Sequence, residues 1–418
     1  MRKYFILILL SICTILGLSQ CGSEPKEETK APTLASGIWR GLIDVQGQSL
    51  WFNFEVKSND SSEVYAELIN AGERILISPE DISFYGDSVK MIMHIFDTEI
   101  RAKIGEGKLT GLYSKNYAPY TLPFEATLGE SHRVVKPDVN AGVAALQERY
   151  MVTFVHESDT TPAVGEFSQK GNHVTGTFLT ETGDYRFLEG GIVDEDQLVL
   201  TAYDGNHAFV FEATIAGDSL VEGHFWSGAS WHETWTAVAD PEAALRDANS
   251  LTYLREGYDR ISFAFPDLNG DTVTLEDPKY AGKAVVLQIF GTWCPNCLDE
   301  TLFYRDWYAA NKDKDVAIIG LAYEQKADFD YASNRVKKMK ERMNVGYDFL
   351  IAGTSDKKAA AETLPMINHV MSFPTSIFIN KDGEVVKIHT GFSGPGTGAH
   401  YDRFVEDFNS TMGELLAE

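Results

Sequence analysis

Cysteine is scarce in this sequence of 418 residues, and its scarcity limits what can hold the fold together. The four cysteines are Cys13, Cys21, Cys294 and Cys297. Because the first two lie in an N-terminal segment that we expect to be cleaved or lipidated, one pair remains for the folded chain. A framework of several disulfides, as in small secreted domains, is therefore excluded. We expect Cys294 and Cys297 to take part in chemistry.

Basic residues are also few, since 36 Lys and Arg stand against 61 Asp and Glu and give a net charge of −25. Nucleic-acid binding depends on clustered Lys and Arg that neutralise phosphates, so nucleic acid is excluded as a partner. The same charge gives no electrostatic attraction to anionic lipid. The histidines of residues 34–240 are scattered without metal-ligand spacing, and we predict no metal site.

One candidate membrane segment lies at the N-terminus. Residues 5–18 form an apolar run that is too short for a convincing membrane-spanning helix. The run ends in Leu18-Ser19-Gln20-Cys21, which resembles a bacterial lipobox, whose cysteine is lipidated. We predict a signal peptide over residues 1–20 and a lipid on Cys21. Because Gln20 stands where a small residue is usual, an uncleaved anchor or another cleavage site stays open.

The segment that follows is polar. Residues 21–33 are poor in apolar side chains and predict a flexible tether. Within it, Lys26-Glu27-Glu28 resembles the signal that directs lipoproteins of Bacteroidota to the cell surface, and a solvated linker of this composition fits equally well. We expect a cell-envelope lipoprotein, either facing the periplasm or exposed on the surface of the outer membrane.

Residues 34–240 are rich in short runs of alternating apolar and polar residues, separated by turn residues, which predict β-strands. The run 107–113 has a counterpart at 218–225, an offset of about 110 residues. We therefore predict two repeated antiparallel meanders, over 34–135 and 148–240, that form a sandwich or a barrel.

A change of pattern marks the rest of the chain. Residues 241–258 begin with Pro241 and predict a short helical linker. In residues 261–418, apolar runs typical of buried strands alternate with helical stretches, which is the order of an α/β thioredoxin fold. The predicted strands are 284–290, 316–321, 349–351, 375–379 and 385–388, and the predicted helices are 294–311, 327–343 and 401–416.

The remaining cysteines lie in Gly291-Thr292-Trp293-Cys294-Pro295-Asn296-Cys297, between a buried strand and a helix. The first amides of a helix lack partners and its dipole favours negative charge, so a cysteine at the N-cap is biased toward the thiolate. Pro295 suits the first helical position, where its missing N–H costs nothing. Cys297, one turn further, can close a disulfide and resolve a mixed disulfide.

Other roles for this cysteine pair are weaker. A zinc site needs two more ligands, and the sequence has no second cysteine pair. Haem attachment needs a histidine after Cys297, where Leu298 stands. A purely structural disulfide between residues three apart would constrain little of the chain. The residues favour thiol–disulfide chemistry, with no cofactor beyond the redox-active disulfide itself.

Four motifs together resemble the TlpA-like thiol–disulfide oxidoreductases of bacterial envelopes, over residues 261–418. They are Phe265-Pro266-Asp267-Leu268-Asn269-Gly270, the cysteine motif, Phe373-Pro374-Thr375 and Asp382-Gly383. The resemblance implies that Cys294 attacks a substrate disulfide and Cys297 resolves the mixed disulfide.

The resemblance also implies a substrate groove. It places a cis peptide before Pro374, assigns the backbone of Phe373 to pairing with the substrate chain, and adds Trp293 to the same groove. The dipeptide Pro295-Asn296 between the cysteines departs from the simplest family pattern, so the direction of electron flow stays open.

Glu324 ends the second of the predicted buried strands. Several TlpA-like proteins carry a glutamate at this strand end, near the buried second cysteine. The resemblance therefore implies that Glu324 accepts and returns the proton of Cys297. An exposed acid at the start of a loop is the alternative.

These features predict an envelope thiol–disulfide oxidoreductase that reduces protein disulfides and receives electrons from an envelope donor. The alternative is a lipid-anchored protein in which residues 34–240 bind a ligand and the thioredoxin-like part senses redox state.

Overall fold

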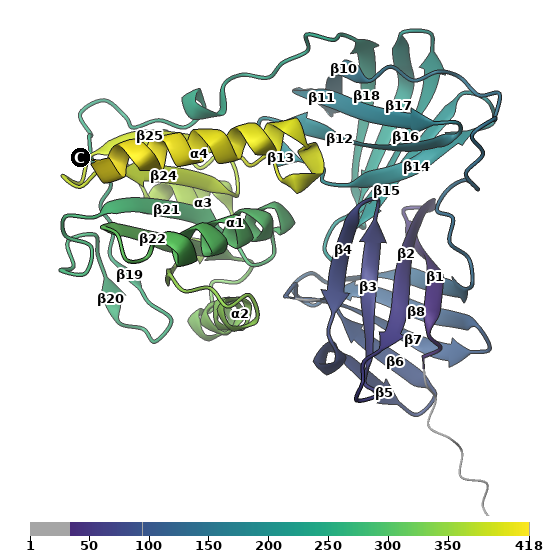
Figure 1. Ribbon diagram of the computed structural model, residues 1–418, viewed down its shortest axis with the longest axis horizontal. Coiled ribbons are helices and arrows are strands. Elements are labelled where there is room, and N and C mark those ends of the chain that lie inside the picture. Colours follow the sequence, from purple (N-terminus) through teal and green to yellow (C-terminus); the bar gives the residue numbers. More distant parts are fainter. Residues whose placement is uncertain (1–33, 94, 418) are drawn as a thin grey trace, which may run out of the picture. The chain divides into compact units, whose positions relative to one another are not determined.

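The computed structural model describes residues 34–93 and 95–417 (Figure 1). The predicted signal peptide, the tether and Cys21 lie outside these residues. Among the helices that are described, none is long and apolar enough to cross a membrane. In chain order, the described residues form a large β-sheet, a β-barrel and a C-terminal α/β domain.

The first part is a nine-stranded antiparallel sheet in the order β4-β3-β2-β1-β9-β8-β7-β6-β5. Buried and more exposed residues alternate along its strands, because one face packs on a core. The strands are β1 (Gly37–Val45), β2 (Gln48–Ser58), β3 (Val64–Asn70), β4 (Glu73–Ile77), β5 (Ile82–Tyr85), β6 (Ser88–Ile92), β7 (Thr98–Gly105), β8 (Lys108–Lys115) and β9 (Tyr120–Leu128), with the 3-10 turn η1 (Pro79–Asp81) between β4 and β5.

The second part is a closed barrel. Strands β10, β11, β12 and β14 to β18 form a continuous antiparallel ring, because β10 pairs with β18 and β11 pairs with β12. Aromatic side chains fill its interior, among them Phe154, Phe178 and Trp235. The strands are β10 (Arg149–His156), β11 (Asp159–Lys170), β12 (His173–Thr180), β13 (Gly183–Asp184), β14 (Leu188–Val193), β15 (Gln197–Tyr203), β16 (Ala208–Ala216), β17 (Ser219–Ser227) and β18 (Trp231–Ala239).

The first sheet and the closed barrel repeat one arrangement. In each, the first strand pairs with the last, β1 with β9 and β10 with β18. The matched runs 107–113 and 218–225 fall on β8 and β17, which occupy the same place beside the last strand. The prediction of an all-β region with two repeated meanders is confirmed, with one sheet for each repeat.

The linker does not form the predicted helix. Residues 241–258 contain only one turn of 3-10 helix, η2 (Ala248–Ser250). Ala243 packs against Leu179 of the closed barrel, and its carbonyl accepts hydrogen bonds from the Arg149 guanidinium. Because the barrel satisfies the linker backbone, tertiary contacts override the helical propensity of its alanines.

The C-terminal part contains a five-stranded sheet in the order β23-β22-β21-β24-β25. β21, β22 and β23 are parallel, whereas β24 runs antiparallel to β21 and β25. Every residue of β21 is buried, as its continuous apolar run predicts for a strand covered on both faces. The strands are β21 (Ala284–Phe290), β22 (Val316–Glu324), β23 (Asp348–Thr354), β24 (Thr375–Ile379) and β25 (Val385–Thr390), and the short pair β19 (Phe265–Pro266) and β20 (Thr272–Val273) lies outside this sheet.

Helices cover this sheet and confirm the thioredoxin fold (Figure 1). They are α1 (Pro295–Asn311), α2 (Phe329–Arg342), α3 (Lys357–Thr363) and α4 (Ala399–Ala417), with the 3-10 turn η3 (Pro395–Thr397) before α4. α1 and α4 pack side by side, where Phe303 contacts Phe404 and Phe408. The sequence did not predict α3, because seven residues are too few for a clear helical period.

Candidate active site

The two cysteines lie where β21 ends and α1 begins, and they are joined in a disulfide. Cys294 is the N-cap of α1, and its Sγ accepts a hydrogen bond of 3.1 Å from the backbone N–H of Cys297. Pro295 occupies the first helical position. Cys294 is 6% exposed and Cys297 is fully buried. The helix terminus therefore offers an amide to the sulfur of Cys294, which stabilises a thiolate when the disulfide is reduced.

The predicted groove residues surround Cys294. The carbonyl oxygen of Phe373 lies 3.4 Å from Cys294 Sγ, and the peptide between Phe373 and Pro374 is cis. The indole N–H of Trp293 donates to the carbonyl of Tyr323 at 2.9 Å, and its ring meets the ring of Phe373 edge to face. The fold thus brings Trp293, Phe373 and Pro374 together beside Cys294.

Glu324, the last residue of β22, is 1% exposed. Its Oε1 accepts from the backbone N–H of Thr292 at 2.8 Å, and its Oε2 accepts from the Thr292 hydroxyl at 2.9 Å. Burial raises the pKa of the Glu324 carboxyl above its ordinary range, although the hydrogen bonds from Thr292 oppose the rise. The structure therefore places Glu324 against the loop that carries Cys294, and its role as a proton carrier stays a prediction.

A second buried acid, Glu300, was missed by sequence reasoning. It lies on α1 one turn after Cys297 and is fully buried. Its Oε2 accepts from the Gln288 side-chain amide at 2.9 Å, and its Oε1 accepts from the hydroxyls of Ser376 at 3.0 Å and Tyr304 at 3.2 Å. Burial raises the pKa of Glu300 to about 7.

A sequence signal for Glu300 did exist. Gln288 interrupts the apolar run of β21, and a buried amide needs polar partners. Its side-chain nitrogen donates to Glu300 and also lies 3.4 Å from the carbonyl oxygen of Cys297. The amide therefore links the buried acid to the backbone of the second cysteine.

Within residues 34–93 and 95–417, no group of three or more His, Cys, Asp or Glu side chains is arranged to hold a metal ion. The arrangement can exchange a disulfide with a thiol through Cys294 without further groups.

Comparison with known proteins agrees with this geometry. The Redoxin family matches residues 257–403. The thiol–disulfide oxidoreductase ResA of Halalkalibacterium halodurans is 28% identical over 137 residues, which cover 33% of this chain and 69% of that protein. ResA of Bacillus thuringiensis subsp. konkukian is 32% identical over 131 residues, which cover 31% of this chain and 67% of that protein.

One of the similar solved structures is the thioredoxin domain of a thiol–disulfide oxidoreductase from Bacteroides vulgatus. It is 24% identical, with a TM-score of 0.27, over 37% of this chain and 99% of that chain.

The fold and the cysteine pair define a thiol–disulfide oxidoreductase. Through its C-terminal part, the chain belongs to the TlpA-like family of the thioredoxin superfamily. The resemblance inferred from the motifs is thereby confirmed, as is the prediction that the protein is an enzyme.

We expect Cys294 to react before Cys297. In reduced protein at mildly acidic pH, iodoacetamide should label Cys294, because the N-terminus of α1 and the Cys297 N–H favour the thiolate at this position. Cys297 should lag, because it is fully buried. Peptide mass mapping after a short pulse checks this, and preferential labelling of Cys297 would contradict the assignment.

Glu300 should make stability depend on pH. Its folded-state pKa of about 7 lies above the ordinary value of 4.5, so between these values the folded chain binds a proton that the unfolded chain releases. The free energy of unfolding therefore falls as pH rises through that window. Glu300→Gln removes this contribution and should flatten the fall by up to about 1.4 kcal/mol per pH unit.

Denaturant unfolding at several pH values, followed by the helical dichroism of the C-terminal part, measures this change. Equal pH dependence in wild type and Glu300→Gln would show that the buried carboxyl does not titrate in this window.

Proposed function

We propose that the protein is an envelope lipoprotein that reduces disulfides in other proteins. The observation that carries the reductase chemistry is the position of Cys294 Sγ. It accepts a hydrogen bond from the Cys297 N–H at the start of α1 and lies 3.4 Å from the Phe373 carbonyl, beside backbone that an extended substrate chain can pair with.

The proposed reaction begins with the reduced pair. The Cys294 thiolate attacks one sulfur of the substrate disulfide, the substrate S–S bond breaks, and the other substrate sulfur leaves as a thiolate that takes a proton. Cys297 then loses its proton and attacks Cys294 Sγ. The second substrate thiolate leaves and is protonated, so the substrate gains two electrons and two protons while the enzyme returns to its disulfide.

The acids around the cysteine motif support the proposed direction of electron flow, from the enzyme dithiol to the substrate disulfide. Glu300 and Glu324 are buried carboxyls beside the cysteine loop, and both have raised pKa values. When they are ionised, carboxyls in this position disfavour further negative charge on the sulfurs of the reduced pair. A destabilised reduced form passes its electrons to substrates more readily. A membrane partner or a soluble thioredoxin-like donor would restore the dithiol.

Within this reaction we propose Glu324 as the group that accepts the proton of Cys297. A buried carboxyl with a raised pKa is suited to take up and return a proton. Its two hydrogen bonds to Thr292 would at the same time hold the loop that presents Cys294.

Cysteine variants test the proposed function with insulin as the protein disulfide and dithiothreitol as the donor. Cys294→Ser should abolish insulin reduction, because no sulfur remains to attack. Cys297→Ser should accumulate a mixed disulfide with an insulin chain, detected by non-reducing mass spectrometry. A Cys294→Ser variant with wild-type activity would refute the assignment.

The same insulin assay separates the roles of Glu324 and Glu300 in proton transfer. Glu324→Gln keeps the side-chain shape but cannot take a proton, so turnover should fall by about tenfold to a thousandfold while Cys294 alkylation changes little. If Glu300→Gln lowers turnover and Glu324→Gln does not, the proton moves through the network of Gln288 instead.

The proposed location rests on the N-terminal sequence. Expressed with its complete N-terminus in a bacterium supplied with radiolabelled palmitate, the protein should carry label on Cys21. Cys21→Ser should lose the label, because no thiol remains at that position. Equal labelling of both proteins would show that the lipobox was misread.

A further inference from the structure

The closed barrel contacts both sides of the cysteine motif. The side-chain amide of Asn206, in the loop between β15 and β16, donates to the Trp293 carbonyl at 2.7 Å. On the other side, the Asn296 side-chain amide donates to the carbonyl of Asp184 at 3.0 Å. The residues that flank Cys294 on each side are therefore bonded to the barrel.

The same barrel also contacts the other two loops of the site. The Ser372 hydroxyl donates to the Thr182 carbonyl, one residue before Phe373. The backbone N–H of Gly394, between β25 and α4, donates to Asp184 Oδ2 at 2.7 Å. We name residues 180–184, which comprise the end of β12, the turn after it and β13, the covering turn. It bonds to each of the loops that would form a substrate groove.

Little space separates the covering turn from the cysteine motif. A side chain on Gly183, whose φ is +137°, would place its Cβ 3.1 Å from the Asn296 amide nitrogen. A Cβ on Gly391 would lie 3.2 Å from the carbonyl oxygen of Glu181. A substrate backbone does not fit into these gaps, so it cannot lie between the covering turn and the loops around Cys294 while the turn is in place. The low exposure of Cys294, 6%, agrees with this.

An ionic cluster fixes the barrel to the helix that carries the cysteines. Arg186, two residues after the covering turn, is buried and forms ion pairs with Asp299 of α1 and Glu73 of the first sheet. Asp204 of the barrel lies 3.3 Å from the same guanidinium. Because one cation pairs with acids from all three parts, it holds the covering turn in a fixed position relative to α1.

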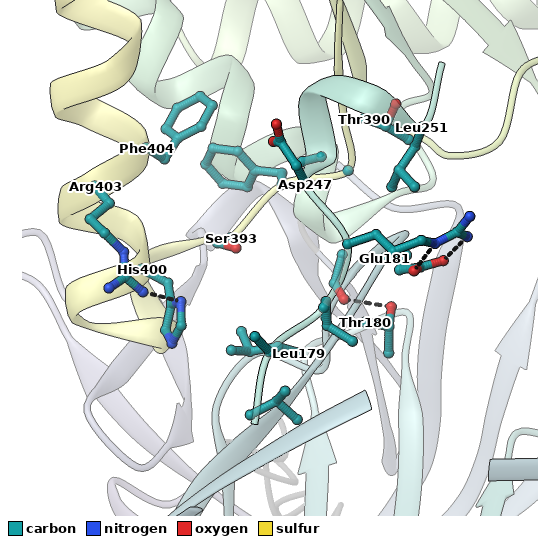
Figure 2. Close-up of a pocket in the computed structure, with 18 of the residues that line it drawn as sticks. Leu179, Thr180, Glu181, Asp247, Leu251, Thr390, Ser393, His400, Arg403 and Phe404 are labelled. Atoms are coloured by element: carbon teal, nitrogen blue, oxygen red, sulfur yellow. Dashed lines mark hydrogen bonds and ion pairs between the residues drawn. The ribbon is translucent and has the colours of Figure 1, made fainter. Parts of the chain in front are cut away.

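Cavities lie on both sides of the covering turn. Thr180 and Glu181 line one of about 730 Å³ and another of about 660 Å³. Figure 2 shows Thr180 and Glu181 facing the first cavity from the barrel, with His400 and Arg403 of α4 on its other side. The turn can therefore swing aside without entering a packed core.

We propose that the covering turn and Asn206 determine which thiols and disulfides reach Cys294. Small thiols reach the sulfur past the edge of the turn, whereas a protein chain must first displace it. This specificity rests on the proposed function, in that Cys294 is the sulfur that reacts.

The test uses the oxidised full-length protein, because that is the state in which the turn is seen. A dithiol donor attacks Cys294 Sγ, breaks the Cys294–Cys297 bond and becomes a disulfide itself, leaving both cysteines as thiols. Dithiothreitol is the small donor and a reduced thioredoxin is the protein donor. Acid quenching, alkylation and mass counting give the rate for each.

Two substitutions loosen the contacts that the covering turn and Asn206 make around Cys294. One adds a negative charge and the other removes one. Asn206→Asp replaces the amide that donates to Trp293 with a carboxylate, which repels that carbonyl. Asp184 accepts from the backbone N–H groups of Arg186 and Gly394, and Asp184→Asn leaves one acceptor oxygen for the two, so one N–H meets the amide NH2 instead. Each should raise the rate with thioredoxin by about tenfold, the factor expected when one buried hydrogen bond is replaced by a repulsion. The rate with dithiothreitol should change less than about twofold.

Asn172→Asp is the matched control. Asn172 lies in the turn between β11 and β12, where its amide bonds to the Lys136 and Asp138 backbone, away from the cysteines. It carries the same chemical change as Asn206→Asp and should leave both rates unaltered. Thermal unfolding checks that each variant is folded. Deuterium uptake at the Gly394 amide should rise in Asn206→Asp and in Asp184→Asn, the two cover variants.

The outcomes separate the two proposals. Unchanged thioredoxin rates in folded cover variants, with faster exchange at Gly394, would show that the cover opens without governing access. If both the thioredoxin rates and the deuterium exchange at Gly394 are unchanged, the hydrogen bonds of Asn206 and Asp184 do not hold the covering turn in place. If dithiothreitol produces no alkylatable thiol at Cys294 and Cys297, the disulfide does not exchange with thiols and the proposed function itself fails.

Discussion

The unpaired amides at the start of α1 are the constraint on which this site depends. A sulfur at the N-cap can use one of them, as Cys294 does with the N–H of Cys297, and Pro295 removes a donor that would otherwise need a partner. The apolar strand β21 fixes where the helix begins, because its side chains are buried on both faces. The chemistry of the pair therefore follows from where a buried strand ends, and the rest of the domain holds that junction in place.

Buried polar groups are a second constraint, since each needs a partner. Glu324 meets this need at Thr292 on one side of the motif, and Glu300 meets it at Gln288 and two hydroxyls on the other. Both carboxyls lose hydration on folding, and both have pKa values raised by burial. The cysteine loop is thus held between acids whose protonation is coupled to the stability of the domain and to the charge on its sulfurs.

The β-rich half is bonded to the reactive half at the point where chemistry occurs. The interior of the closed barrel is packed with aromatic rings, so its contribution to the site comes from its rim. There, the covering turn and Asn206 contact the loops around Cys294, and Arg186 joins acids of all three parts. A barrel that binds the rim of a thioredoxin-fold site controls access to a sulfur that the isolated domain would expose, which gives the β region a role in the redox reaction.

The sequence by itself determined the class of fold and the reacting pair. Apolar runs with strand or helix period set the elements of the thioredoxin fold, and local helix-capping chemistry pointed to Cys294. A single acid in a helix has no periodic signature, so the only signal for Glu300 was indirect, in the polar Gln288 within the apolar run of β21. The linker alanines favoured a helix that Arg149 and the barrel prevented. Only the tertiary structure brought residues 182–184 and Asn206 to the cysteines, which follow them by about ninety to more than a hundred positions in the chain. Contacts between residues so far apart depend on how the closed barrel, the linker and the α/β domain pack, and no local pattern in the sequence encodes that packing.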